Sequence, residues 1–126
     1  MIFKAKFPLP PSSNGAYPTS FKTKKRFKSQ DYKDWLAKLP KLYSAYFDAE
    51  TPCELTLNIW FKDTRNRDIG NYEKLIIDYL VEQGILSDDN FKILQRKITN
   101  FAGIDKKEPR IEVVIKPLPD SLKVSY

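Results

Sequence analysis

The sequence predicts a small α/β fold, a single domain with a mixed β-sheet and two main helices in the order β-β-α-β-α-β-β. Two observations support this prediction. A stretch near the middle of the chain alternates apolar and polar residues, and the next long stretch carries apolar residues at helical spacing. A chain of 126 residues is long enough to bury one core. We predict one domain over residues 1–117 and a loose tail over residues 118–126.

The first part of the chain contains two expected strands and one expected helix. Residues 2–7 alternate as a strand does, and residues 16–21 are expected to form a second strand after a turn rich in proline and serine. Ser29 is expected to cap a helix whose apolar side chains recur at helical spacing as far as Phe47. Pro40 is expected to kink or split this helix, because proline cannot donate a backbone hydrogen bond.

The second part contains the clearest elements. Cys53 to Lys62 alternates over its whole length, which predicts a strand with one buried face. Asn71 to Gln83 has an apolar stripe at helical spacing, and Gly84 follows at the position where glycine commonly ends a helix. Residues 91–101 and 110–116 are expected to form two closing strands joined by a polar turn.

The composition excludes several classes of site. The chain has no histidine, so neither Ser-His or Cys-His catalysis nor histidine-bound zinc is available. Its one cysteine, Cys53, excludes a disulfide framework within one chain and a cysteine-rich zinc site. Lysine and arginine outnumber aspartate and glutamate by 22 to 16, which favours a polyanionic partner. With no signal peptide and no long apolar stretch, we expect a soluble cytoplasmic protein.

Carboxylates beside cations mark the candidate site. Asp68 follows Arg65 and Arg67 just before the expected second helix, and Asp88 and Asp89 follow that helix. Carboxylates held near a phosphate backbone by a basic protein are typical of a Mg²⁺ site, because hard cations prefer oxygen ligands. Asp68 could instead be a helix cap or a surface ion-pair partner, and the two later acids could form an ordinary turn.

Several motifs occur together in a fixed order. Pro10 and Pro11 follow the first expected strand, and a basic stretch leads into the first helix. The most specific motif is Arg-Asp-x-x-Asn-x-x-Lys, and a glycine-initiated Asp-Asp turn and a final strand follow it. These two motifs are formed by Arg67, Asp68, Asn71 and Lys74, and by Gly84 to Asp89. Over residues 3 to 117, the chain resembles the RusA-type Holliday junction resolvases of phages and prophages.

The resemblance implies a small α/β fold in a tight, intertwined homodimer. It implies Mg²⁺-dependent hydrolysis, with Mn²⁺ as a possible substitute, that makes paired nicks across four-way DNA junctions in the cytoplasm of a bacterial host. By this similarity Asp68 and Asp89 are metal ligands and catalytic residues, Asp88 is a neighbouring metal-binding acid, and Lys74 is a catalytic cation facing the phosphate. The residues expected to bind DNA are Lys22, Lys24, Lys25, Arg26, Lys28, Arg65, Arg67 and Asn71.

The chain departs from the family pattern at one position. Members commonly carry a second aspartate two residues after the first, whereas this chain has Gly70. Losing a carboxylate removes one ligand and one negative charge from the site. Glu73 is the candidate replacement, because its longer side chain could reach back toward Asp68. Alternatively, Glu73 only complements the helix N-terminus, and the protein is a weakened or inactive relative that binds junctions.

The expected helix also affects how the site is assembled. A helix from Asn71 to Gln83 is about 20 Å long, which places Asp68 and Asp89 at opposite ends unless the following turn folds back. We therefore expect a composite metal site that takes Asp68 from one subunit and Asp88 and Asp89 from its partner. Three other functions remain open at this point: a junction binder, a nuclease for flaps or single strands, and an unrelated basic α/β protein.

Overall fold

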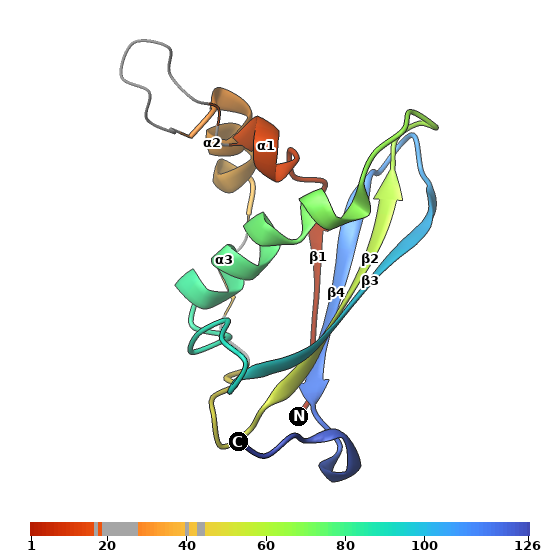
Figure 1. Ribbon diagram of the computed structural model, residues 1–126. Coiled ribbons are helices and arrows are strands. Elements are labelled where there is room, and N and C mark those ends of the chain that lie inside the picture. The colour runs from red at the N-terminus through yellow and green to blue at the C-terminus, as the bar shows by residue number, and fades with distance from the viewer. Residues whose placement is uncertain (17, 19–27, 40, 43–44) are drawn as a thin grey trace.

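A computed structural model describes residues 1–16, 18, 28–39, 41–42 and 45–126 of the chain. A four-stranded sheet forms one layer, and the helices α1, α2 and α3 all lie on one face of it (Figure 1). The elements in chain order are β1 (Phe3–Pro8), α1 (Ser13–Ala16), α2 (Gln30–Ala37), β2 (Cys53–Phe61), η1 (Ile69–Tyr72), α3 (Lys74–Glu82), β3 (Leu94–Ile104), β4 (Arg110–Pro117) and η2 (Asp120–Leu122), where η marks a 3₁₀ helix.

The sheet is mixed, as the sequence predicted. Its strand order is β1-β4-β2-β3, so β4 lies between β1 and β2, and β3 forms an edge. β4 runs antiparallel to both of its neighbours, whereas β2 and β3 run parallel. Parallel neighbours need a crossover connection, and η1 and α3 provide it on the covered face of the sheet. The two closing strands β3 and β4 follow each other in the chain but are separated in the sheet by β2.

The core lies between β2 and α3. The alternation of β2 is confirmed, because its apolar face is almost fully buried, and the apolar stripe of the second main helix is buried against it. Complete burial of one leucine, isoleucine or phenylalanine side chain contributes about 1.5–3 kcal/mol. The buried residues of these two elements are Cys53, Leu55, Leu57, Ile59, Phe61, Leu75, Ile76, Ile77, Tyr79 and Leu80.

The second main helix is shorter than predicted. The expected first turn forms η1, and regular α-helix begins only at Lys74. Its end is as predicted, because Gly84 has a φ of 78° and its N–H donates to the Val81 carbonyl at 3.0 Å. The next N–H, that of Ile85, donates to the Leu80 carbonyl at 2.9 Å. This pair of bonds satisfies carbonyl groups that a helix end leaves open, and its glycine adopts a conformation that other residues rarely take.

Two other predictions about secondary structure were wrong. Ala16 ends α1 and is fully buried, so it does not begin a second strand; residues 17 and 19–21 of that expected strand lie outside the described residues. Ser29 does cap a helix by accepting the Tyr32 N–H at 3.1 Å, but this helix ends at Ala37. Phe47 was expected in the same helix and instead forms a parallel bridge with Leu86.

The tail after residue 117 is attached to the domain and is not the loose segment that was expected. Leu118 is buried, and its N–H donates to the Pro52 carbonyl at 2.9 Å. Further on, the Val124 N–H donates to Gln95 Oε1 at 3.1 Å, and the Gln95 side chain donates back to the Val124 carbonyl. These contacts hold the tail beside the start of β3.

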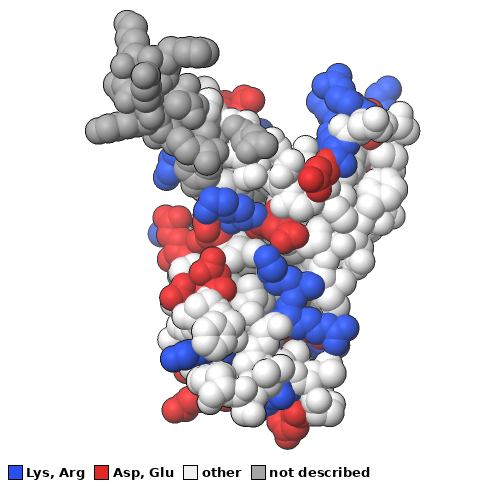
Figure 2. Space-filling model, viewed as in Figure 1, with Lys and Arg blue, Asp and Glu red and all other residues white. Residues whose placement is uncertain are grey.

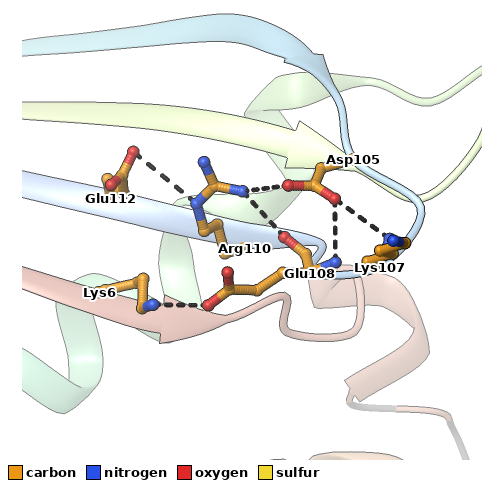
Figure 3. A network of polar contacts seen from close by, with 6 residues as sticks. All are labelled: Lys6, Asp105, Lys107, Glu108, Arg110 and Glu112. Atoms are coloured by element: carbon orange, nitrogen blue, oxygen red, sulfur yellow. Dashed lines mark hydrogen bonds and ion pairs between the residues drawn. The ribbon is translucent and has the colours of Figure 1, made fainter.

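A polar network fixes the turn between β3 and β4 (Figure 3). The carboxylate of Asp105 accepts the N–H groups of Lys107 and Glu108 at 3.1 and 3.0 Å, and it pairs with Arg110 at 2.8 Å. These hydrogen bonds lower the pKa of Asp105, and the bond from the Glu108 N–H lowers it most strongly. Glu108 also pairs with Lys6 on β1. These contacts therefore connect the turn after β3 to β4 and to β1.

Cys53 provides a test of the core. Its side chain is completely buried, and burial raises the pKa of its thiol to about 12. Because the thiolate is the reactive form, we expect iodoacetamide at pH 8 to leave the native chain unmodified and to alkylate Cys53 after unfolding in urea. Mass spectrometry of the two samples measures this difference. Rapid alkylation of the native protein would show that the first residues of β2 are not packed as described.

Candidate active site

Several of the candidate residues line one pocket, between the helices and the sheet face that they cover. Its lining comes from η1, from the first turns of α3, from the loop after α3 and from β3. The lining residues are Gly70, Glu73, Lys74, Ile77, Asp78, Asp89 and Lys97. We call this the acid–lysine pocket. Basic and acidic side chains are interleaved over α3 and the neighbouring strand rather than separated into patches (Figure 2).

The acid–lysine pocket bears on the expected site shared between subunits. α3 has nine residues and is about 13 Å long, shorter than the 20 Å expected. The loop that follows it folds back, so that Asp89 lines the same pocket as Gly70 and Lys74 of the same chain. Asp68 is not among the residues that line this pocket, so a metal site shared between two subunits stays a prediction.

Asp68 is the N-cap of η1. Its Oδ1 accepts the Gly70 N–H at 3.0 Å, and its backbone carbonyl accepts the Asn71 N–H at 3.1 Å. The capping alternative considered for Asp68 thus describes its contacts. The Asp68 side chain is exposed and adjoins the pocket through Gly70.

Glu73 is bound to β3. One carboxylate oxygen accepts from Lys97 Nζ at 3.2 Å, and the other accepts from the Thr99 hydroxyl at 3.0 Å. The side chain makes no capping hydrogen bond to α3, although it precedes the first helical residue. Both oxygens are therefore bonded to the sheet side of the pocket, and the replacement of a carboxylate beside Asp68 by Glu73 stays a prediction.

The remaining acids divide between the pocket and the loop. Asp78 pairs with Lys74 one helical turn earlier, at 3.1 Å, so the proposed catalytic cation already has a carboxylate neighbour. Asp88 accepts the Asp89 N–H at 2.7 Å and the Asn90 side-chain amide at 3.1 Å, and the first of these bonds lowers the pKa of Asp88. Asp88 thereby shapes the turn that brings Asp89 to the pocket.

The carboxylates of the described residues do not complete a metal site. Within this part of the chain, no three acids gather closely enough to hold a metal ion. Gly70 lies where the missing ligand is expected. A Cβ added there would be 3.4 Å from Asp68 Oδ1, an ordinary contact, and the Gly70 backbone is not in the left-handed region. The backbone at position 70 can therefore accept a residue that has a Cβ atom without strain.

The expected DNA-binding cations have different surroundings. Arg67 is nearly buried; it pairs with Asp63 at 2.8 Å, donates to the Asp63 and Arg65 carbonyls, and lies 5.0 Å from the Phe61 ring centroid. It therefore supports the loop, whereas Arg65 is exposed. Lys28 is also exposed and lies over the Tyr32 ring. The expected contacts Lys22, Lys24, Lys25 and Arg26 lie outside the described residues.

Sequence reasoning missed two charged residues that line the pocket, Lys97 and Asp78, and Thr99, which holds Glu73. Lys97 and Thr99 occupy alternate positions of β3 opposite Leu55 and Leu57, so they face the same side as the core. Nothing local distinguishes them from solvated strand residues, because their role depends on which strand β3 pairs with. The pairing of Asp78 with Lys74 could have been predicted from the sequence, since residues four apart are neighbours on a helix.

Comparison with known protein families gives a match over most of the chain. The sequence profile of the family Endodeoxyribonuclease RusA matches residues 8–116. No curated protein matches the chain at a significant level. In the described residues, no helix has the length and apolar character needed to cross a membrane.

Proposed function

Because the chain belongs to the RusA family of endodeoxyribonucleases, we propose that it resolves four-way DNA junctions by Mg²⁺-dependent, paired hydrolysis of phosphodiester bonds. The family consists of Holliday junction resolvases that depend on divalent metals. The observation that carries the assignment to this site is that Asp89, Lys74 and Lys97 line one pocket beside the Asp68 cap. We propose that the protein acts as a homodimer in a bacterial cytoplasm, because a symmetric junction needs two sites.

In this proposal the two lysines of the acid–lysine pocket bind the phosphate to be cleaved. Lys74 and Lys97 are each at least half exposed and are held by Asp78 and Glu73. Ion pairs of this kind fix the position of a lysine without removing it from solvent. Mg²⁺, or Mn²⁺ in its place, would supply charge stabilisation of the reacting phosphate. The described carboxylates fall short of a complete metal site, so we propose that the chain binds the metal weakly.

A second candidate function is junction binding without cleavage. It is favoured by one observation, the glycine at position 70 beside the Asp68 carboxylate. A labelled four-way junction, incubated with the protein with and without Mg²⁺, separates the two. Nicked product that requires Mg²⁺ supports the nuclease, and a mobility shift alone supports the binder. Flap and single-stranded substrates in parallel test for a nuclease of other branched DNA.

Asp89→Asn should abolish cleavage and leave junction binding intact. The change removes a negative charge from the pocket while keeping the size of the side chain, so we expect a loss of roughly a hundredfold or more in the single-turnover rate. Asp120→Asn is the matched control, because Asp120 is exposed in η2 and does not line the pocket. Equal rates for the two variants would remove Asp89 from the site.

Gly70→Asp should strengthen metal binding. The new carboxylate would lie beside that of Asp68, and a divalent cation relieves the repulsion between them. We expect the Mg²⁺ concentration for half-maximal cleavage to fall about tenfold, or ~1.4 kcal/mol in metal binding. Mg²⁺ should also raise the Tm of this variant more than that of the wild type. Gly70→Asn adds the same bulk without charge and should behave as the wild type; if it matches Gly70→Asp, charge is not the cause.

A mixture of inactive subunits tests whether one chain supplies the whole site. Lys74→Ala and Asp89→Asn damage the same pocket of a single chain. After subunit exchange, every site in a mixed dimer still carries one lesion, so we expect no return of cleavage. A mixed dimer of wild-type and double-mutant subunits is the positive control and should nick one strand. Restored nicking in the first mixture would establish a site composed from both subunits.

A further inference from the structure

A second hollow adjoins the start of η1. Phe61, Ile69, Phe101 and Ile104 give it an apolar floor, and Arg65 and Arg67 lie at its rim. Two of the apolar side chains are unusually exposed, Phe101 at 56% and Ile104 at 45%. We call this the aromatic hollow. Large exposed apolar side chains beside a functional site indicate a contact surface.

Phe101 is the outer ring of a stacked pair. Its ring centroid is 6.2 Å from that of Phe61, with an angle of 18° between the two planes. Phe61 is buried, whereas more than half of Phe101 is accessible. Arg67 lies over the Phe61 ring and holds the loop that borders the hollow. The floor of the hollow therefore consists of the buried Phe61 ring and the accessible Phe101 ring stacked on it.

The aromatic hollow and the acid–lysine pocket lie on the same face of the same strand. Lys97, Thr99 and Phe101 alternate along β3, opposite the buried residues of β2. Lys97 lines the pocket, and Phe101 is four residues further along, roughly 13 Å away at about 3.3 Å per residue. A nucleic-acid strand that places a phosphate at Lys97 and continues along β3 would pass over Phe101.

Charge favours a nucleic acid over a second copy of the chain in this hollow. Arg65 is exposed at the rim, and Arg67 lies behind it. Arg67 is already paired with Asp63, which also lines the hollow, so Arg65 supplies the accessible charge. An anionic strand gains from Arg65, whereas two copies that met face to face here would bring their Arg65 side chains together. The bases of such a strand present flat apolar faces to the ring.

We propose that the aromatic hollow is a stacking site for an unstacked base at the junction's exchange point, with Phe101 as the platform and Arg65 as the contact to the adjacent phosphate. This inference rests on the proposed function, since an open four-way junction leaves base faces unstacked where its arms exchange strands. A base stacked on Phe101 would hold the exchange point beside the acid–lysine pocket. Stacking of this kind tolerates any base, because every base has a flat face.

Binding measured without divalent cations tests the site apart from cleavage. The probe is a four-way junction with 2-aminopurine at the exchange point, and a fully paired duplex of the same sequence is the reference. For Phe101→Ala, we expect junction affinity to fall on the order of tenfold, with little change on the duplex, and the fluorescence change on binding to disappear. Phe101→Tyr keeps the ring and should retain both properties.

Tyr46→Ala is the matched control. Tyr46 is 53% exposed and precedes the bridge to Leu86, beyond the opposite end of α3 from η1. Its removal should change neither affinity nor fluorescence. Wild-type behaviour of Phe101→Ala would overturn the stacking site and leave the proposed function standing. Loss of dimers by this variant in analytical ultracentrifugation would instead assign the hollow to a second copy. A wild-type chain that fails to bind the junction would overturn the proposed function and this site with it.

Discussion

The parallel pairing of β2 and β3 is the constraint on which the rest of the structure depends. Two parallel neighbours require the chain to cross the sheet between them, and here that crossover consists of η1, α3 and the acidic loop. Every described residue of the acid–lysine pocket lies on the crossover or on β3. The bonds from Glu73 to Lys97 and Thr99 join the start of α3 directly to the strand that the crossover serves. The pocket is thus a consequence of the connection, and it would not exist if β3 paired with another strand.

The same constraint explains which features the sequence could predict. Period-two alternation in β2 and the glycine after α3 are local signals, and both elements end within one or two residues of the predicted positions. The family motif likewise singled out Lys74 and Asp89, which line one pocket. The fold-back of the loop after Gly84 is not local. It depends on the hydrogen bond from the Asp89 N–H to the Asp88 carboxylate and on the return to β3, so helix length alone could not predict that Asp89 lines the same pocket as Gly70.

Side chains whose role depends on tertiary pairing could not be recognised in the sequence. Lys97 and Thr99 lie in a strand whose sequence suggests that most of its side chains are exposed to solvent. Their direction toward α3 follows only from the register in which β3 pairs with Leu55 and Leu57. The capping role of Asp68 was available as an alternative, because aspartate is among the preferred N-cap residues. The early helix start was wrong for a related reason. Once Asp68 caps a 3₁₀ turn, the regular helix begins only after Glu73, whose carboxylate is held by the sheet.

Position 70 links these observations to activity. A cap at Asp68 uses one carboxylate oxygen to bind the Gly70 N–H, so the side chain is held at the border of the pocket. The backbone conformation at position 70 suits residues other than glycine, and the nearest atom to an added Cβ is Asp68 Oδ1. Glycine at this position is therefore not demanded by the fold. Under the proposed function, glycine here leaves the lysines of the pocket with fewer opposing carboxylates, which would favour phosphate binding and weaken metal binding. Junction affinity and cleavage rate would then respond in opposite directions to a carboxylate at this one position.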